Sequence, residues 1–134
     1  MRLGELFAQG YAAGTAPDRD SPAALAAQRA CALKAPAWIS LELHIPPGSK
    51  FPQWEEQVAL ACAAQNMLLA ATAFGLASKW ASGAVMVSPL TAQALGAPRR
   101  LGFIFPGFPA RSVPDSTRAP LAQTVTWAEE AGAP

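Results

Sequence analysis

The stretch from Gln53 to Ala77 constrains the fold most, because it is the longest regular pattern in the 134-residue chain. Glu55 and Glu56 fall in its first turn, where carboxylates favour the positive end of a helix dipole. The residues that follow are apolar almost all round, which is typical of a helix covered on several sides. We therefore predict one long helix that is buried either in a core or at a dimer interface.

A membrane span is the alternative for this helix, since residues 58–77 are nearly long enough to cross a bilayer. However, Gln65 and Asn66 lie together at its centre, where unpaired amides are costly in hydrocarbon. No cluster of basic residues marks one flank, as the orientation of a membrane helix usually requires. We therefore expect no membrane partner.

The composition points to a partner subunit. Hydrophobic residues make up 51% of the chain and charged residues only 14%, against about 25% in an average soluble domain. So few polar side chains cover the apolar surface of one small domain poorly, and we expect a homodimer. The formal net charge of +1, with Lys and Arg scattered, gives no footprint for nucleic acid.

The two cysteines, Cys31 and Cys62, stand far apart and have no second cysteine or histidine at metal-ligand spacing. We expect two buried thiols in a reducing compartment and no metal site. The first ten residues include Glu5 and lack the long apolar block of a signal peptide, so the cytoplasm is the expected location.

The remaining elements mix helices and strands, so the predicted class is α+β. Ser21-Pro22 and Ser88-Pro89 each place an N-cap serine before a proline at the first helical position. Runs of β-branched and apolar residues predict strands. The expected elements are helices over 3–13, 21–33 and 88–95, strands over 38–45 and 100–105, an extended piece at 79–83, and a regular segment over 121–130.

The usual catalytic constellations are missing from the sequence. The one histidine, His44, ends a predicted strand, where a structural or exposed histidine is the ordinary case. A Gly-x-Ser-x-Gly motif is absent, and the Gly-Ser-Lys at 48–50 lacks the spacing of a phosphate loop. Glu55 and Glu56 are adjacent, so they point to different sides of a helix and cannot pair as acid and base. The pattern alone predicts no catalytic residue.

Four segments carry a recognisable order of motifs. They are KFPQWE at 50–55 with ACAAQNMLLAA at 61–71, AFGLASKW at 73–80, Ser82-Gly83 followed by Ser88-Pro89, and LGFIF at 101–105 followed by GFP at 107–109. In this order and spacing they resemble the central helix, the turn after it and the last strand of the FMN-dependent nitroreductase family. The likeness is closest to the family's short single-domain subgroup. It covers about residues 31–130 and, more loosely, the first thirty.

The resemblance implies a nitroreductase-like α+β fold with FMN bound at a homodimer interface. Family members accept hydride from NADH or NADPH and pass electrons to nitroaromatic, quinone or similar acceptors. The flavin carries the redox chemistry, so the protein needs no acid–base residue of its own. That property fits the absence of a catalytic constellation.

The resemblance also assigns binding residues. Gly83 would let the chain approach a flat ring closely. Core packing is the alternative for Trp80, and an ordinary solvated position is the alternative for Arg118, which matches a basic residue towards the FMN phosphate. The residues implied for FMN are Trp80, Ala81 (where an arginine is common), Ser82, Gly83 and Arg118; those implied for the nicotinamide nucleotide are Ala70, Ala71, Thr72, Ala73, Phe74 and Gly75.

Two departures from the family pattern modify these expectations. Pro106 replaces an apolar residue and is expected to shorten the last strand. Complete members open with an Arg-Arg-Ser motif that grips the FMN phosphate, and Met1 falls after the matching position. We therefore expect a domain over residues 1–134 that is incomplete at its N-terminus and binds FMN weakly. The alternative is a non-catalytic remnant that keeps the dimerising core and binds no flavin.

Overall fold

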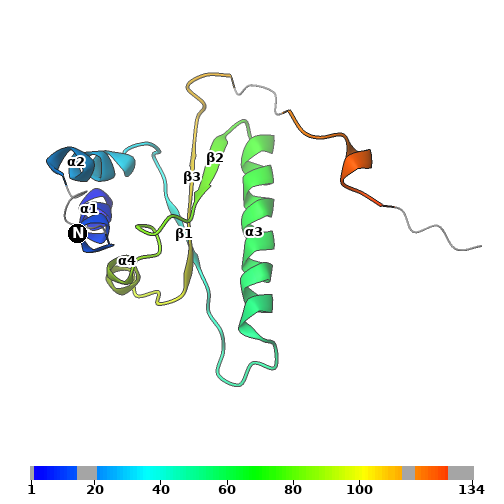
Figure 1. Cartoon of the computed structure of the whole chain (residues 1–134), viewed down its shortest axis with the longest axis horizontal. Helices are drawn as coiled ribbons and strands as arrows, with labels where there is room; N and C mark the ends of the chain where they lie inside the picture. The colour runs from blue at the N-terminus through cyan, green and yellow to red at the C-terminus, as the bar shows by residue number, and fades with distance from the viewer. Residues whose placement is uncertain (1, 15–20, 113–116, 127–134) are drawn as a thin grey trace, which may run out of the picture.

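A three-stranded antiparallel sheet lies between two helical layers (Figure 1). The computed structural model describes residues 2–14, 21–112 and 117–126. Helix α3 covers one face of the sheet, and α1, α2 and α4 lie over the other, so the predicted α+β class is confirmed. In chain order the elements are α1 (Leu3–Gly14), α2 (Pro22–Cys31), β1 (Ile39–Glu42), α3 (Gln53–Ala73), β2 (Ala77–Ala81), α4 (Pro89–Ala94), β3 (Arg100–Gly107) and the 3₁₀ turn η2 (Leu121–Gln123).

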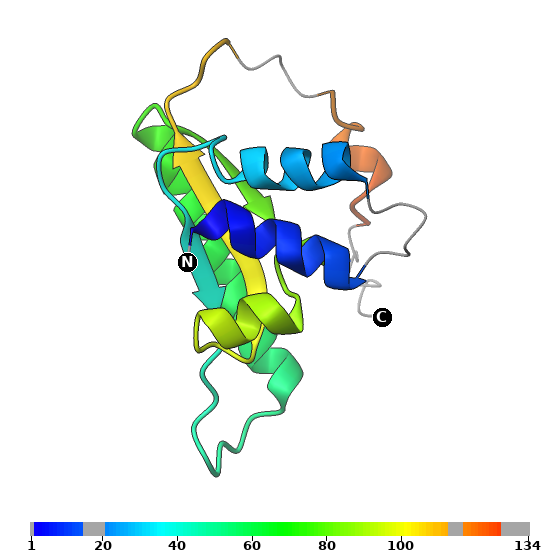
Figure 2. The same cartoon turned by 90° about the vertical axis from the view of Figure 1, so that its left-hand side faces the viewer.

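Both predicted serine caps are confirmed. The Ser21 hydroxyl accepts a hydrogen bond from the backbone N–H of Ala24 at 3.1 Å, at the start of α2. The Ser88 hydroxyl accepts one from the backbone N–H of Thr91 at 3.2 Å, at the start of α4. Figure 2 shows α1 and α2 lying side by side across the sheet, with α4 next to α1.

Strand β3 is central in the sheet, whose order is β1-β3-β2. Trp80 of β2 lies opposite Ile104 of β3, and Lys79 lies opposite Phe105. Because neighbouring residues of a strand face opposite ways, Trp80 and Ile104 point towards α3. Lys79 and Phe105 therefore point to the face covered by α1 and α2.

An aromatic cluster fills the core on the face covered by α1. The Phe7 ring lies edge-on to the rings of Trp38 and Phe103, with centroid distances of 5.3 and 5.8 Å. The Trp38 indole stacks on Phe105 at 4.5 Å and donates its ring N–H to the carbonyl oxygen of Ala32 at 3.1 Å. These contacts join α1 and the segment after α2 to the central strand.

Helix α3 is not covered on all sides within one chain, which corrects the prediction of a buried core helix. Of its residues only Ala64 is buried, where it packs with Leu41 and Ile104. On its outer face the side chains of Trp54 and Val58 are 62% and 53% exposed. The interface alternative for this helix remains a prediction.

Three further boundaries differ from the predicted ones. Helix α3 ends at Ala73 rather than Ala77, because Gly75 adopts the left-handed conformation (φ +73°) that closes many helices. Strand β1 is shorter than 38–45, since its register with β3 shifts after Leu41. The regular segment expected over 121–130 is present only as the turn η2, and residues 127–130 lie outside the described residues.

Pro106 does not shorten the last strand, contrary to expectation, since β3 runs to Gly107. The pairing of β1 with β3 ends at Ile104, so β3 has a neighbour on one side only at Pro106. Half of the backbone groups there lack a strand partner in any case. A missing N–H is therefore tolerated, as at sheet edges generally.

The structure also bears on the membrane and thiol predictions. None of the described helices has the length and apolarity that a membrane crossing requires. Cys31 is half-buried, whereas Cys62 is exposed on α3, so the prediction of two buried thiols is wrong for Cys62.

Candidate functional site

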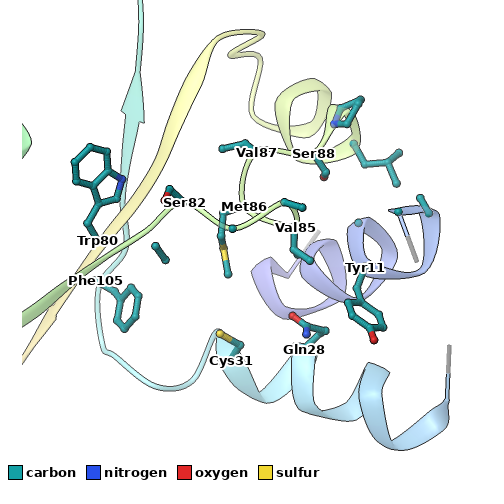
Figure 3. Close-up of a pocket in the computed structure, with 18 of the residues that line it drawn as sticks. Tyr11, Gln28, Cys31, Trp80, Ser82, Val85, Met86, Val87, Ser88 and Phe105 are labelled. Atoms are coloured by element: carbon teal, nitrogen blue, oxygen red, sulfur yellow. The ribbon is translucent and has the colours of Figure 1, made fainter. Parts of the chain in front are cut away.

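A cavity of about 960 Å³ opens on the α1 side of the sheet. Its walls come from α1, α2, the segment 79–90 and Phe105. Figure 3 shows Gln28 and Cys31 of α2 facing the space that Val85 and Met86 border from the other side. The lining is mostly apolar with few polar groups, as in typical small-molecule sites.

The turn formed by residues 80–83 lines this cavity, but its members contribute differently. The indole of Trp80 packs in the cluster on the α3 side, and its ring N–H donates to the carbonyl oxygen of Leu101 at 2.9 Å. In Figure 3 the Trp80 ring accordingly points away from the other lining residues. Its side chain is therefore part of the core, and Ala81, Ser82 and Gly83 form the wall itself.

Gly83 borders open space. A Cβ built on Gly83 meets no atom within 4 Å, and its φ lies outside the left-handed region. Nothing else in the described chain therefore requires glycine at this position. The room beside it suits the close approach of a flat ligand, and the assignment of Gly83 to FMN remains a prediction.

Gly102 holds the wall in place, and the sequence reasoning missed it. Its φ of +117° is rare for other residues, and a Cβ on it would overlap the carbonyl oxygen of Ala81. The same Cβ would lie 3.0 Å from the Cα of Ser82. Only glycine therefore lets the segment after β2 pass so close to the central strand. The available signal was the glycine of the LGFIF motif.

A hydroxyl network fixes residues 85–88, which line the cavity beyond the wall. The buried Thr91 hydroxyl donates to the carbonyl oxygen of Val85 at 3.0 Å and lies 2.9 Å from the Ser88 hydroxyl. A Cβ on Gly10 would lie 2.9 Å from the same Ser88 oxygen. The glycine in α1 thus allows that helix to pack closely against the start of α4.

Charge at the cavity is positive. Lys34 and Lys79 line it, and the described lining residues include no carboxylate. Elsewhere Glu5 and Arg29 pair at 2.8 Å between α1 and α2, and the hydrogen bond from Arg29 lowers the pKa of Glu5. Both members of this pair lie outside the cavity lining.

Arg100, also missed, is a buried cation at the start of β3. Its side chain is 1% exposed and its guanidinium lies over the Phe103 ring, 5.3 Å from the centroid. Burial lowers its pKa, against a weaker opposite effect of Glu42 at 3.9 Å. Its Nε and Nη1 atoms are buried and have no hydrogen-bond partner among the residues that the structure describes.

Comparison with known proteins agrees with the motifs and the fold. The family model described as "Nitroreductase family" matches residues 2–107, which is most of the chain. The chain belongs to the nitroreductase family.

Individual nitroreductases show the same likeness. The chain is 29% identical over 122 residues to the "Putative NAD(P)H nitroreductase YdjA" of Escherichia coli K12 and to that of strain O157:H7. It is also similar to the crystal structure of a nitroreductase-like family protein from Bacillus cereus, with a TM-score of 0.70 and 20% identity over 95% of the chain. The expected nitroreductase-like fold is thereby confirmed. The chain spans 64% of the length of the curated relatives and 66% of that structure.

The residues that the family resemblance assigns to the nicotinamide nucleotide lie apart from the cavity. Residues 70–75 form the end of α3 and the turn after it, and none of them lines the cavity. Thr72 donates its hydroxyl to the carbonyl oxygen of Leu68 at 3.1 Å, and Phe74 is 82% exposed. Within one chain, the structure therefore does not bring this segment together with the turn at 80–83.

Arg118 is also apart from that turn. It is exposed in the described segment 117–126, which stands away from the sheet and its helices (Figure 1). It does not line the cavity described above. Within one chain, Arg118 does not lie near the turn at 80–83. Its role towards a flavin phosphate therefore remains a prediction.

Proposed function

We propose that this nitroreductase-family chain is an FMN-dependent oxidoreductase that takes hydride from NADH or NADPH and reduces nitroaromatic, quinone or similar acceptors. The observation that carries the proposal is the cavity wall at Ala81, Ser82 and Gly83. These three residues, which the family resemblance assigns to FMN, line the cavity of about 960 Å³, with open space at Gly83. The cavity is ample for a planar ring system and its ribityl chain.

The chain's own residues would bind and orient the flavin, and FMN when bound supplies the hydride-transfer chemistry. The backbone of residues 81–83 would lie along the ring edge, fixed by the contact of Gly102 with Ala81. Apolar side chains such as Val85 and Met86 would exclude water from the ring. No side chain of this wall has to gain or lose a proton in this scheme.

Self-association through the outer face of α3 is part of the proposal. Trp54, Val58, Cys62 and Leu69 are all exposed and lie along one stripe of the helix. The stripe carries no charge, and each Å² of apolar surface that it buries contributes about 25 cal/mol. A second copy presenting the same stripe is the partner that suits it, as in most soluble oligomers.

A dimer also affects the nucleotide assignment. Residues 70–75 form the end of α3, on one face of the sheet, and the turn after it, whereas the cavity opens on the other face. In the proposed enzyme a second subunit would therefore have to bring this segment near the flavin.

Sedimentation at micromolar concentration tests the interface. We expect wild type to sediment as a dimer and Val58→Glu as a monomer, because the variant places a charge in the apolar stripe. A monomeric wild type contradicts it.

The activity itself is tested by NADH and NADPH oxidation with added FMN and a nitroaromatic or quinone acceptor. We expect acceptor-dependent oxidation that Gly83→Val abolishes, because the valine would occupy the space of the ring. Ala110→Val is the matched control, since Ala110 is exposed and does not line the cavity. Activity absent from wild type at saturating FMN, or equal in all three proteins, contradicts the proposal.

A further inference from the structure

Two lysines stand at the junction of two cavities. Lys34 and Lys79 line the large cavity and also a second one of about 180 Å³ beside it, and Phe105 borders both. Both lysines are exposed, and neither forms an ion pair within the part of the chain that the structure describes. They are the only charged side chains among the described residues that line either cavity.

The fold fixes both positions. Lys79 faces this side because Trp80, its neighbour in β2, points to α3. Lys34 is placed by the turn that ends α2, in which its backbone N–H donates to the carbonyl oxygen of Cys31 at 3.2 Å. Phe105 is held between the two cavities by its stacking on Trp38.

Two like charges beside an apolar, carboxylate-free cavity create a positive potential with nothing in the described lining to neutralise it. An oxyanion that contacts both ammonium groups gains charge-assisted hydrogen bonds. The smaller cavity has the volume of about six water molecules, which is room for such a group.

We propose that Lys34 and Lys79 form an anion subsite for a planar aromatic ligand whose ring lies in the large cavity. The shared chemistry is an oxyanion, either the phosphate of a flavin or the carboxylate of an acidic electron acceptor. Only the identity of the ligand rests on the proposed function; the subsite itself rests on the two lysines and the cavities.

A matched pair of fluorescent probes tests the subsite without requiring flavin. 8-Anilinonaphthalene-1-sulfonate carries a sulfonate, whereas N-phenyl-1-naphthylamine has nearly the same rings and no charge. The preference is the ratio of the affinities for the charged and the uncharged probe. We expect wild type to bind the sulfonate more tightly, and we expect this ratio to fall about tenfold in Lys34→Met/Lys79→Met. Higher salt, from roughly 50 to 500 mM, weakens the preference in wild type but not in the double variant. Lys50→Met is the control, because Lys50 is exposed and lines neither cavity.

A wild type without preference for the sulfonate, or a double variant that keeps it, overturns the proposal. So does an equal loss in Lys50→Met, since the effect would then be one of general charge. Circular dichroism checks that the double variant is folded. We expect it to fold because both substituted lysines are exposed.

Titration with FMN and riboflavin identifies the source of the anion. If the double variant loses the advantage of FMN over riboflavin, the subsite takes the flavin phosphate. If that advantage is unchanged while the sulfonate preference is lost, it takes the acid group of an acceptor. Wild type that binds neither flavin but prefers the sulfonate refutes the proposed function and leaves the anion subsite standing.

Discussion

Replacing Gly102 by alanine tests how the cavity wall is held. The φ of +117° costs a residue with a side chain about 1–3 kcal/mol. The new methyl group would also overlap the carbonyl oxygen of Ala81 and lie 3.0 Å from the Cα of Ser82. Overpacking of this kind costs about 1–3 kcal/mol more. We therefore expect the free energy of unfolding to fall by about 2–6 kcal/mol, a large part of the 5–15 kcal/mol typical of a domain.

Urea unfolding followed by tryptophan fluorescence measures this loss. Gly83→Ala is the matched control, because a Cβ there meets nothing within 4 Å and the φ of Gly83 lies outside the left-handed region. Its unfolding free energy should stay within about 0.5 kcal/mol of wild type. A loss below about 1 kcal/mol in Gly102→Ala, at an unchanged urea dependence, would refute the reasoning.

Three further predictions concern side chains outside the cavity wall. Arg100→Met removes a buried, poorly paired charge, so its unfolding free energy should be unchanged or about 1–4 kcal/mol higher; a clear loss in urea contradicts this. Trp80→Phe leaves the Leu101 carbonyl without its donor and should cost about 1–3 kcal/mol, while flavin affinity stays within about twofold because the indole lies on the α3 side. Arg29 lowers the pKa of Glu5, so the stability that this pair contributes is present above the ordinary carboxyl pKa of 4.5 and is lost as the pH falls below it. The difference in unfolding free energy between wild type and Glu5→Gln should therefore shrink as the pH falls. A difference that stays constant from about pH 7 to about pH 3 contradicts this prediction.

Local signals in the sequence predicted much of the fold. Ser21 and Ser88 mark helix starts because their hydroxyls bond to backbone groups only three residues away. The unbroken apolar pattern predicted the long helix correctly. It did not predict where the helix ends, because the apolar run continues past Gly75, whose left-handed conformation closes the helix. Pro106 misled because its tolerance depends on where β1 stops pairing, a property of another segment.

The site was less accessible from the sequence, since it depends on which face of the sheet each residue takes. The turn at 80–83 was found through the family resemblance, but the sequence left open whether Trp80 faces a ligand or the core. Its pairing opposite Ile104, and the position of α3, place the indole in the core. Lys34 and Lys79 are 45 positions apart by number, and only the packed sheet and α2 bring them to one cavity border.

The contact between Gly102 and Ala81 has a consequence for attempts to redesign the pocket. The backbone of Ala81 and Ser82 packs directly against the central strand, so its position is fixed by the sheet. Loop grafting or random insertion at these residues therefore cannot change the shape of the wall. Changes of ligand range should instead come from Ala84 and Val87, which line the cavity further along the same segment and are exposed. A library confined to those two positions should therefore yield many folded variants, whereas one that includes Gly102 should be dominated by unstable proteins.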